Sequence, residues 1–148
     1  MKVSDLMRTF FLTVPPDTTL RKANELMHQF GSDYIIVTEG KKLLGMVTYS
    51  SLFRQILPSY AEVMRDESYW FDPSSIEKRV ADISIKTVKE IMVPELINIH
   101  PDMPIVEAGA LMASKKIKQL PVIDSNNELV GVISFKDITW GFLIKPLT

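Results

Sequence analysis

The feature that most constrains this chain is an internal repeat. When the sequence is shifted by 85 residues against itself, identical residues align along most of its length. The identical pairs are Val3 with Val88, Met7 with Met92, Pro16-Asp17 with Pro101-Asp102, Ala23 with Ala108, Leu26-Met27 with Leu111-Met112, and Val37 with Val122. Ordinary composition yields only about two such identities by chance. Duplication of one structural unit therefore explains the pattern.

Each copy carries the same order of local signals: strand, helix, two strands joined by a turn, and a second helix. In the first copy Asp17 is the expected N-cap, apolar residues then recur at helical spacing, and Gly31 is expected to stop the helix. The elements predicted for the first copy are strands at 11–14, 34–37 and 43–47, with helices at 20–30 and from residue 50. Those predicted for the second copy are strands at 97–99, 120–123 and 129–133, with helices at 105–115 and from residue 135.

A unit of roughly 50 residues buries too little surface to be stable alone. We therefore expect an α+β fold in which two β-α-β-β-α repeats pack through their sheets as a pseudo-twofold pair. The predicted organisation is a first repeat at 1–57, an ordered helical insertion at 58–86 and a second repeat at 87–148. In the insertion, Asp72 and Pro73 mark the start of a helix, and Trp70 and Phe71 are expected to pack against the body.

Composition narrows the classes of function. Lys and Arg number 17 against 18 Asp and Glu, so no overall field draws the chain to nucleic acid or to an anionic membrane. No apolar run approaches the roughly 18 residues that span a bilayer, and the absence of cysteine excludes disulfides and thiol chemistry. The expected location is the cytoplasm. His28 and His100 lack partners at metal-ligand spacing, and no catalytic motif is present, so we expect neither a metal site nor an enzyme.

The two copies differ at the start of their last helices. Ser134 and Asp137 stand three residues apart in the second copy, where the first copy has Thr48 and Ser51. Residue spacing supports two interpretations equally. The pair forms a helix capping box, or the Asp137 carboxylate, which only accepts hydrogen bonds, binds a ligand at the amide-rich helix start. Ser51 offers a single neutral oxygen, so the first copy is expected to bind such a ligand weakly or not at all.

The order of elements, with Leu120–Asp124 before the hairpin turn and Gly131-Val132-Ile133-Ser134-x-x-Asp137 at the last helix, resembles a tandem pair of cystathionine beta-synthase (CBS) domains, a Bateman module. The resemblance implies a non-catalytic regulatory module that senses AMP, ADP, ATP or S-adenosylmethionine in a cleft between the repeats. It also implies a homodimer, with an enzyme or a transporter as the regulated partner. The apolar faces proposed for dimerisation are Phe53, Ile56 and Leu57, or Ile138, Phe142 and Leu143.

The same resemblance implies two unequal clefts. In the main cleft Asp137 is expected to hold the ribose, and Lys136 is expected near the phosphates. The residues assigned to this cleft are Leu12, Thr13, Ser32, Asp33, Tyr34, Val132, Ser134, Lys136 and Asp137. Those assigned to the second, weaker cleft are Thr48, Ser50, Ser51, Asn98, Ile117 and Lys118. The competing interpretation is an interaction or structural module with empty clefts, which docks a partner through the insertion around Trp70.

Overall fold

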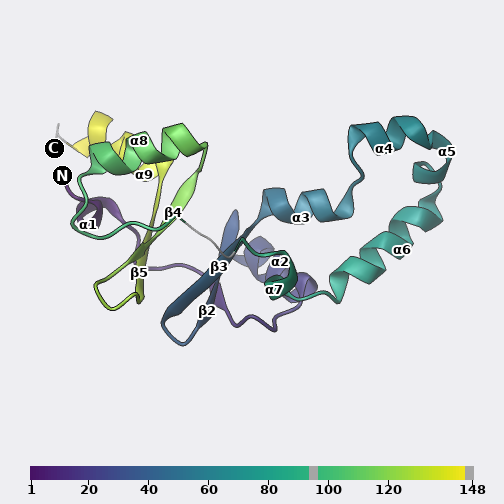
Figure 1. Cartoon of the computed structure of the whole chain (residues 1–148), viewed down its shortest axis with the longest axis horizontal. Coiled ribbons are helices and arrows are strands. Elements are labelled where there is room, and N and C mark those ends of the chain that lie inside the picture. The colour runs from purple at the N-terminus through teal and green to yellow at the C-terminus, as the bar shows by residue number, and fades with distance from the viewer. Residues whose placement is uncertain (94–96, 146–148) are drawn as a thin grey trace. The chain divides into compact units, whose positions relative to one another are not determined.

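A computed structural model describes residues 1–93 and 97–145 of the chain. Helices and strands follow one another in the predicted order, except that the strand expected at 97–99 is only an isolated bridge at Ile99. The chain divides into two compact units (Figure 1). Unit 1 comprises Met1–Phe11, Gly40–Leu43 and the described residues of Glu95–Thr148. Unit 2 comprises Leu12–Glu39 and the described residues of Leu44–Pro94. Each unit mixes helices with a small sheet, which agrees with the α+β class expected from the sequence.

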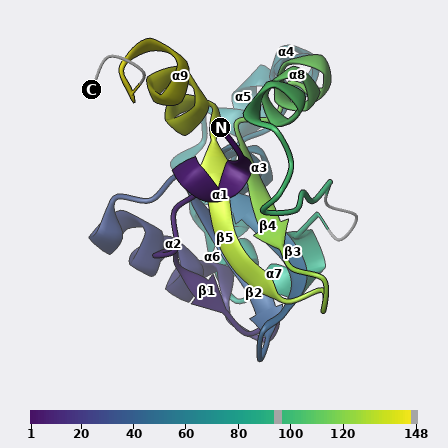
Figure 2. The ribbon, with the colours of Figure 1, turned by 90° about the vertical axis from the view of Figure 1, so that its left-hand side faces the viewer.

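Unit 1 is built on the hairpin of the second repeat, whose two strands lie side by side in Figure 2. Its elements are α1 (Val3–Leu6), α8 (Ile105–Lys115), β4 (Gln119–Ile123), β5 (Leu129–Ser134) and α9 (Phe135–Leu143). The strands are antiparallel, with Gln119 opposite Ser134, and Ile99 adds a parallel bridge to Val122. This register places the start of α9 beside the residue that opens β4.

Unit 2 contains most of the first repeat together with the insertion. Its elements are β1 (Thr13–Val14), α2 (Leu20–Phe30), β2 (Tyr34–Glu39), β3 (Lys42–Thr48, of which the first two residues group with unit 1), α3 (Tyr49–Ile56), α4 (Tyr60–Arg65), α5 (Glu67–Trp70), α6 (Pro73–Ser84) and α7 (Val88–Ile91). The sheet order is β1-β2-β3, and β1 runs parallel to β2 with Thr13 opposite Ile36. Gly31 ends α2 in the left-handed conformation at φ 62°, as predicted.

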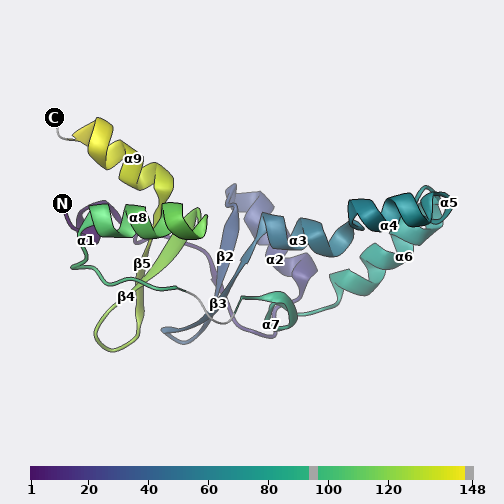
Figure 3. The ribbon, with the colours of Figure 1, turned by 45° about the horizontal axis from the view of Figure 1, so that its top comes forward.

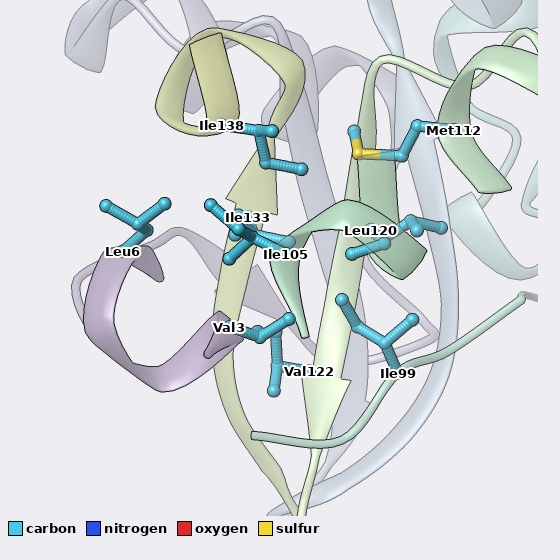
Figure 4. Close-up of a cluster of buried hydrophobic side chains, with 10 residues drawn as sticks. Val3, Leu6, Ile99, Ile105, Met112, Leu120, Val122, Ile133 and Ile138 are labelled. Carbon is cyan, nitrogen blue, oxygen red and sulfur yellow. The ribbon is translucent and has the colours of Figure 1, made fainter. Parts of the chain in front are cut away.

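Each unit has a hydrophobic core that combines strand positions with apolar residues of the helices that pack on them. Burial of such aliphatic side chains stabilises a fold by about 1.5–3 kcal/mol each. The core of unit 1 consists of Val3, Leu6, Ile99, Ile105, Ala108, Met112, Leu120, Val122, Ile133 and Ile138 (Figure 4). The core of unit 2 consists of Val14, Leu20, Ala23, Met27, Ile35, Val37, Val47, Leu52 and Val88.

The short helices that open the two repeats, α1 and α7, are exchanged between the units, and we call them the lead-in helices. Helix α1 opens the first repeat, yet Val3 is fully buried in unit 1 and its N–H donates to the Met103 carbonyl at 2.8 Å. Helix α7 opens the second repeat, yet Val88 is fully buried in unit 2 and its N–H donates to the Thr18 carbonyl at 2.8 Å. Each compact unit combines segments of both repeats. The repeat ranges 1–57 and 87–148 therefore describe the duplicated sequence and stay a prediction.

The insertion is helical. Pro73 takes the first position of α6, and Asp72 Oδ1 accepts a hydrogen bond from the Ser74 N–H at 3.1 Å, as the sequence indicated. Helix α6 runs beside α3 (Figure 3), where Arg79 Nε donates to the Gln55 carbonyl at 3.2 Å. The insertion is therefore tied to the first repeat within unit 2.

Two further local predictions, the N-cap of α2 and the packing of Phe71, are wrong. The N-cap of α2 is Thr19 and not Asp17, and the Thr19 hydroxyl accepts from the Lys22 N–H at 3.1 Å. Helix α2 begins at Leu20, which is too far along the chain for Asp17 to be its N-cap. Phe71 is 70% exposed, so it does not pack against the body. The matching prediction for the Trp70 side chain lies outside the described part of the structure.

One proposed dimer face also requires correction. The sequence groups Ile138 with Phe142 and Leu143 as one apolar face, but Ile138 is only 6% exposed and belongs to the core of unit 1. Phe142 and Leu143, in the last turn of α9, are exposed. Ile138 therefore stabilises the unit itself.

Candidate functional site

The start of α9 is closed by a reciprocal capping box. Ser134 is the N-cap, and its hydroxyl accepts a hydrogen bond from the Asp137 N–H at 3.2 Å. In return, Asp137 Oδ2 accepts from the Ser134 N–H and from the Ser134 hydroxyl, each at 2.9 Å. The capping interpretation of this pair is thus confirmed, and one carboxylate oxygen is used for it.

The other carboxylate oxygen of Asp137 faces a cation. Arg8 Nε donates to Asp137 Oδ1 at 3.0 Å, in an ion pair where the arginine side chain is 63% exposed and the aspartate side chain only 10%. Arg8 is not among the residues that the sequence assigned to the site. It lies just after α1, and the exchange of the lead-in helices brings it to the second repeat.

The backbone of Arg8 is held on strand β5. Its N–H donates to the Val132 carbonyl at 2.8 Å, and the Val132 N–H donates to the Arg8 carbonyl at 2.9 Å. Gly131 permits this approach, because a Cβ there would lie 2.8 Å from Met7 Sδ and 3.0 Å from the Arg8 carbonyl oxygen. The glycine of the Gly131 to Asp137 motif therefore positions the lead-in segment against the sheet.

Asp137 opens into a pocket of about 400 Å³ within unit 1. The pocket is lined by Asp5, Leu6, Arg8, Lys136, Asp137 and Trp140. Two basic and two acidic side chains line it, but Asp5 Oδ2 already accepts from the Lys2 N–H at 2.8 Å. The side chain of Lys136, which is exposed, is the second cation of the pocket lining beside Arg8.

The first repeat forms the same capping box without the charges. The Ser51 N–H donates to Thr48 Oγ1 at 3.2 Å, and the Thr48 N–H donates to Ser51 Oγ at 3.0 Å. The position that corresponds to Arg8 is Val93, whose N–H donates to the Met46 carbonyl at 3.2 Å, as Arg8 does to Val132. Both members of the ion pair are thus replaced in unit 2, by Val93 and Ser51.

Unit 2 gathers the residues that the sequence assigned from the first repeat. The Ile36 N–H donates to the Leu12 carbonyl at 3.0 Å, Ser32 Oγ donates to the Tyr34 carbonyl at 2.6 Å, and the Tyr49 N–H donates to the Asp33 carbonyl at 3.0 Å. These contacts place Leu12 and Thr13, the entrance of β2, and the start of α3 with Thr48, Ser50 and Ser51 at one edge of the sheet.

Unit 1 gathers the residues assigned from the second repeat in the same way. The Phe135 N–H donates to the Lys118 carbonyl at 3.0 Å, which joins the entrance of β4, with Ile117 and Lys118, to the start of α9. Asn98 precedes the bridge that Ile99 makes to this sheet, and Val132 is buried in β5. Each unit therefore carries residues assigned to both predicted clefts, and the composition of either complete cleft stays a prediction.

Asp5, Leu6, Arg8 and Trp140 line the pocket but were missed by sequence reasoning. A signal for Arg8 exists, because the repeat alignment pairs Arg8 with Val93 and Asp137 with Ser51, so that each charged residue has an uncharged counterpart in the other copy. That signal becomes readable only when α1 is known to pack on the second repeat.

Two further properties bear on the chemistry of the chain. Within residues 1–93 and 97–145, no group of three or more His, Asp or Glu side chains is arranged to hold a metal ion. His100 Nδ1 instead lies 3.1 Å from the Ile123 carbonyl oxygen. Among the helices in these same ranges, none combines the length and the apolar character needed to cross a membrane.

Comparison with known proteins matches this architecture to one family. The CBS domain model matches residues 3–58 and 88–141, which are the two repeats. The CBS domain-containing protein YhcV of Bacillus subtilis is 31% identical over 136 residues, covering 92% of this chain and 81% of YhcV. An inosine-5'-monophosphate dehydrogenase of Korarchaeum cryptofilum is 29% identical over 127 residues, covering 86% of this chain but only 21% of the dehydrogenase. The chain thus spans about a fifth of that relative.

A solved structure shows the same fold. The crystal structure of CBSX2 in complex with AMP, a CBS-pair protein of Arabidopsis thaliana, superposes with a TM-score of 0.74 at 20% identity. The superposition covers 98% of each chain. The two matches of the family model show that this chain belongs to the CBS domain family and carries the domain as a tandem pair.

Proposed function

We propose that this chain is a non-catalytic regulatory module that senses an adenosine-containing ligand, with Asp137 holding the ribose. The observation that carries the proposal is the pocket at the start of α9, where a carboxylate is flanked by the cations Arg8 and Lys136. A carboxylate accepts hydroxyl hydrogen bonds, and cations at an amide-rich helix start attract phosphate. The pocket therefore offers complementary groups to both parts of a nucleotide.

Similar proteins support the choice of ligand class. CBSX2, which shares the fold over nearly the whole chain, has been crystallised with AMP. The dehydrogenase relative supports a regulatory role attached to an enzyme. In our proposal Leu12, Thr13, Ser32, Asp33 and Tyr34 complete the main cleft.

The capping box does not exclude ligand binding. Capping uses Oδ2 of Asp137, whereas Oδ1 faces the pocket through its contact with Arg8. One side chain thus stabilises the helix start and presents an acceptor to the ligand. The first repeat retains the cap and lacks the acid, so we propose a weaker second cleft formed with Thr48, Ser50, Ser51, Asn98, Ile117 and Lys118.

The proposal is tested by calorimetric titration of the purified chain with AMP, ADP, ATP, adenosine and S-adenosylmethionine. We expect one dominant ligand per chain, with a thermal shift that corresponds to about 2.7 kcal/mol at 100 times the dissociation constant. The matched control is 2'-deoxyadenosine monophosphate, which should bind about tenfold more weakly because it lacks one ribose hydroxyl. Equal affinity for the ribose and deoxyribose forms would remove Asp137 from the site.

We further propose a cytoplasmic homodimer that regulates an enzyme or a transporter. Phe53 on α3 and Leu57 directly after it, and Phe142 and Leu143 on α9, are large apolar side chains on the exposed surface of the chain. Burial of these side chains against a second copy would remove them from water. Light scattering during gel filtration measures the mass, and a monomer at all concentrations would contradict dimerisation.

A second candidate function is supported by the insertion. Tyr60, Met64 and Phe71 are exposed there, with Tyr60 at 80% exposure, which is typical of a protein-binding surface more than of a structural arm. In this alternative the clefts are empty and the insertion docks a partner. The nucleotide titration separates the two candidates, because a docking module with empty clefts gives neither heat nor thermal stabilisation with any nucleotide.

A further inference from the structure

We propose that Arg8 makes the Asp137 pocket selective for phosphorylated adenosine ligands. In the chain without ligand it occupies the outer oxygen of Asp137, and on binding the ribose displaces it towards the phosphate. This inference rests on the proposed ligand site and specifies which adenosine compounds that site prefers. The selectivity is for AMP, ADP or ATP over adenosine.

The first step concerns the acceptor capacity of Asp137. An ionised carboxylate offers about four lone-pair sites. The Ser134 N–H and hydroxyl use two of them on Oδ2, and Arg8 Nε–H uses one on Oδ1. Two ribose hydroxyls cannot both be accepted while these three bonds persist. The bond to Arg8 is the one that can be released without opening the helix cap.

The second step concerns the reach of Arg8. Its backbone is fixed by two hydrogen bonds to Val132, whereas its side chain is 63% exposed. Because only its backbone is bonded to β5 and its side chain reaches solvent, the guanidinium can leave Asp137 without moving the sheet. Its five N–H donors form a planar fork that can bind two oxygens of a phosphate group. When the ribose takes Asp137 Oδ1, these donors are available to the phosphate.

The third step concerns charge. When Asp137 is engaged by the ribose, Arg8 and Lys136 are two cations on the pocket wall, and Asp5 stays an anion whose Oδ2 accepts from the Lys2 N–H. A phosphate gives the guanidinium that the ribose displaces a new anionic acceptor. A neutral nucleoside gives it none. Displacement of Arg8 is therefore compensated by a phosphorylated ligand and not by adenosine.

The repeat supplies an internal comparison. Unit 2 has Val93 at the Arg8 position and Ser51 at the Asp137 position, with the same backbone bridge and the same capping box. The cap is thus formed without either charge. Arg8 and Asp137 are not needed to build the helix start, which favours a role of the ion pair in the pocket.

The alternative role for Arg8 is structural. The Arg8 side chain is 63% exposed, so solvent screens its ion pair even though Asp137 is only 10% exposed. A purely structural arginine would affect all ligands alike. The ratio of AMP affinity to adenosine affinity distinguishes the two roles. A structural defect leaves this ratio unchanged, whereas loss of a phosphate contact lowers it.

The test compares Arg8→Gln, Arg8→Lys and Lys2→Gln with the unaltered chain in calorimetric titrations with AMP and with adenosine. Lys2 lies at the same end of the chain and pairs with Asp102 at 3.7 Å outside the pocket, so Lys2→Gln removes the same charge as a matched control. We expect Arg8→Gln to weaken AMP binding about tenfold and to leave adenosine binding unchanged or up to severalfold tighter. Arg8→Lys should retain part of the preference, and Lys2→Gln should change neither affinity more than about twofold.

The outcomes separate this inference from the proposed function. If the unaltered chain binds neither AMP nor adenosine, the proposed function fails. If it binds both and Arg8→Gln changes them by the same factor, the ligand site stands and the role of Arg8 is overturned. A selective loss of AMP affinity supports both. Equal thermal stability of Arg8→Gln and Lys2→Gln confirms that the comparison is made between folded proteins.

Discussion

Arg8 Nε donates a 3.0 Å hydrogen bond to Asp137 Oδ1 across 129 residues of sequence. The contact joins the segment that follows the lead-in helix of the first repeat to the last helix of the second repeat, within one compact unit. The acid that we propose as the ribose acceptor is thus already paired with an arginine. In our proposal, binding at Asp137 is therefore an exchange of partners and not the simple occupation of a free carboxylate.

The first prediction concerns Asp137→Ser, which copies the residue of the first repeat. The Thr48 and Ser51 box shows that serine caps the equivalent helix, so the free energy of unfolding should fall by less than about 1 kcal/mol. Affinity for AMP should fall more than tenfold, because two charge-assisted hydrogen bonds of about 1.5–3 kcal/mol each are lost. Calorimetry and urea unfolding measure the two effects. Unchanged AMP affinity would exclude Asp137 as the ribose acceptor.

The second prediction transfers the ion pair to the first repeat. The double variant Ser51→Asp with Val93→Arg places an acid and an arginine at the positions of unit 2 that correspond to Asp137 and Arg8. The backbone bridge between Met46 and Val93, which corresponds to that between Val132 and Arg8, is already present. We expect a second AMP to bind per chain, and more tightly than in Ser51→Asp alone. The stoichiometry of a calorimetric titration reports this directly. A double variant that still binds one ligand shows that the first repeat lacks more than these two charges.

The third prediction concerns Gly131. A Cβ at this position would lie 2.8 Å from Met7 Sδ and 3.0 Å from the Arg8 backbone oxygen, so Gly131→Ala should destabilise the chain by about 1–3 kcal/mol. Gly109→Ala is the control, since a Cβ there meets Ile138 Cγ2 at 3.4 Å and alanine favours the helix by about 1 kcal/mol. Urea unfolding should give shifts of opposite sign. Equal behaviour of the two variants would contradict the close approach at β5.

The fourth prediction tests the exchange of the lead-in helices. Val3→Ala and Val88→Ala each remove two buried methyl groups and should cost about 2 kcal/mol. Hydrogen exchange should show Val3→Ala loosening α8, β4 and β5, and Val88→Ala loosening α2 and β2. Each variant is the control for the other. If Val88→Ala instead loosened β4 and β5, α7 would belong to the second repeat in space as it does in sequence.

Local signals predicted most of the elements. Helix α8 occupies Ile105–Lys115 as expected, and Gly31 ends α2 in the left-handed conformation. Apolar periodicity, turn residues and caps depend on neighbours a few residues apart, which is why one sequence is enough to read them. Where several polar residues compete for one cap, as Asp17 and Thr19 do, the sequence does not decide between them.

The sequence by itself determined the duplication, the order of elements and the difference between Asp137 and Ser51, because each is a comparison between positions along one chain. Only the tertiary structure decided that α1 packs on the second repeat, that Gly131 admits the Arg8 backbone, and that Arg8 therefore reaches Asp137. Contacts across 129 residues leave no periodic trace, since they depend on which apolar surfaces bury each other and not on local spacing. The difference between Arg8 and Val93 was visible in the repeat, but it acquired a chemical meaning only when the fold placed the arginine beside the acid.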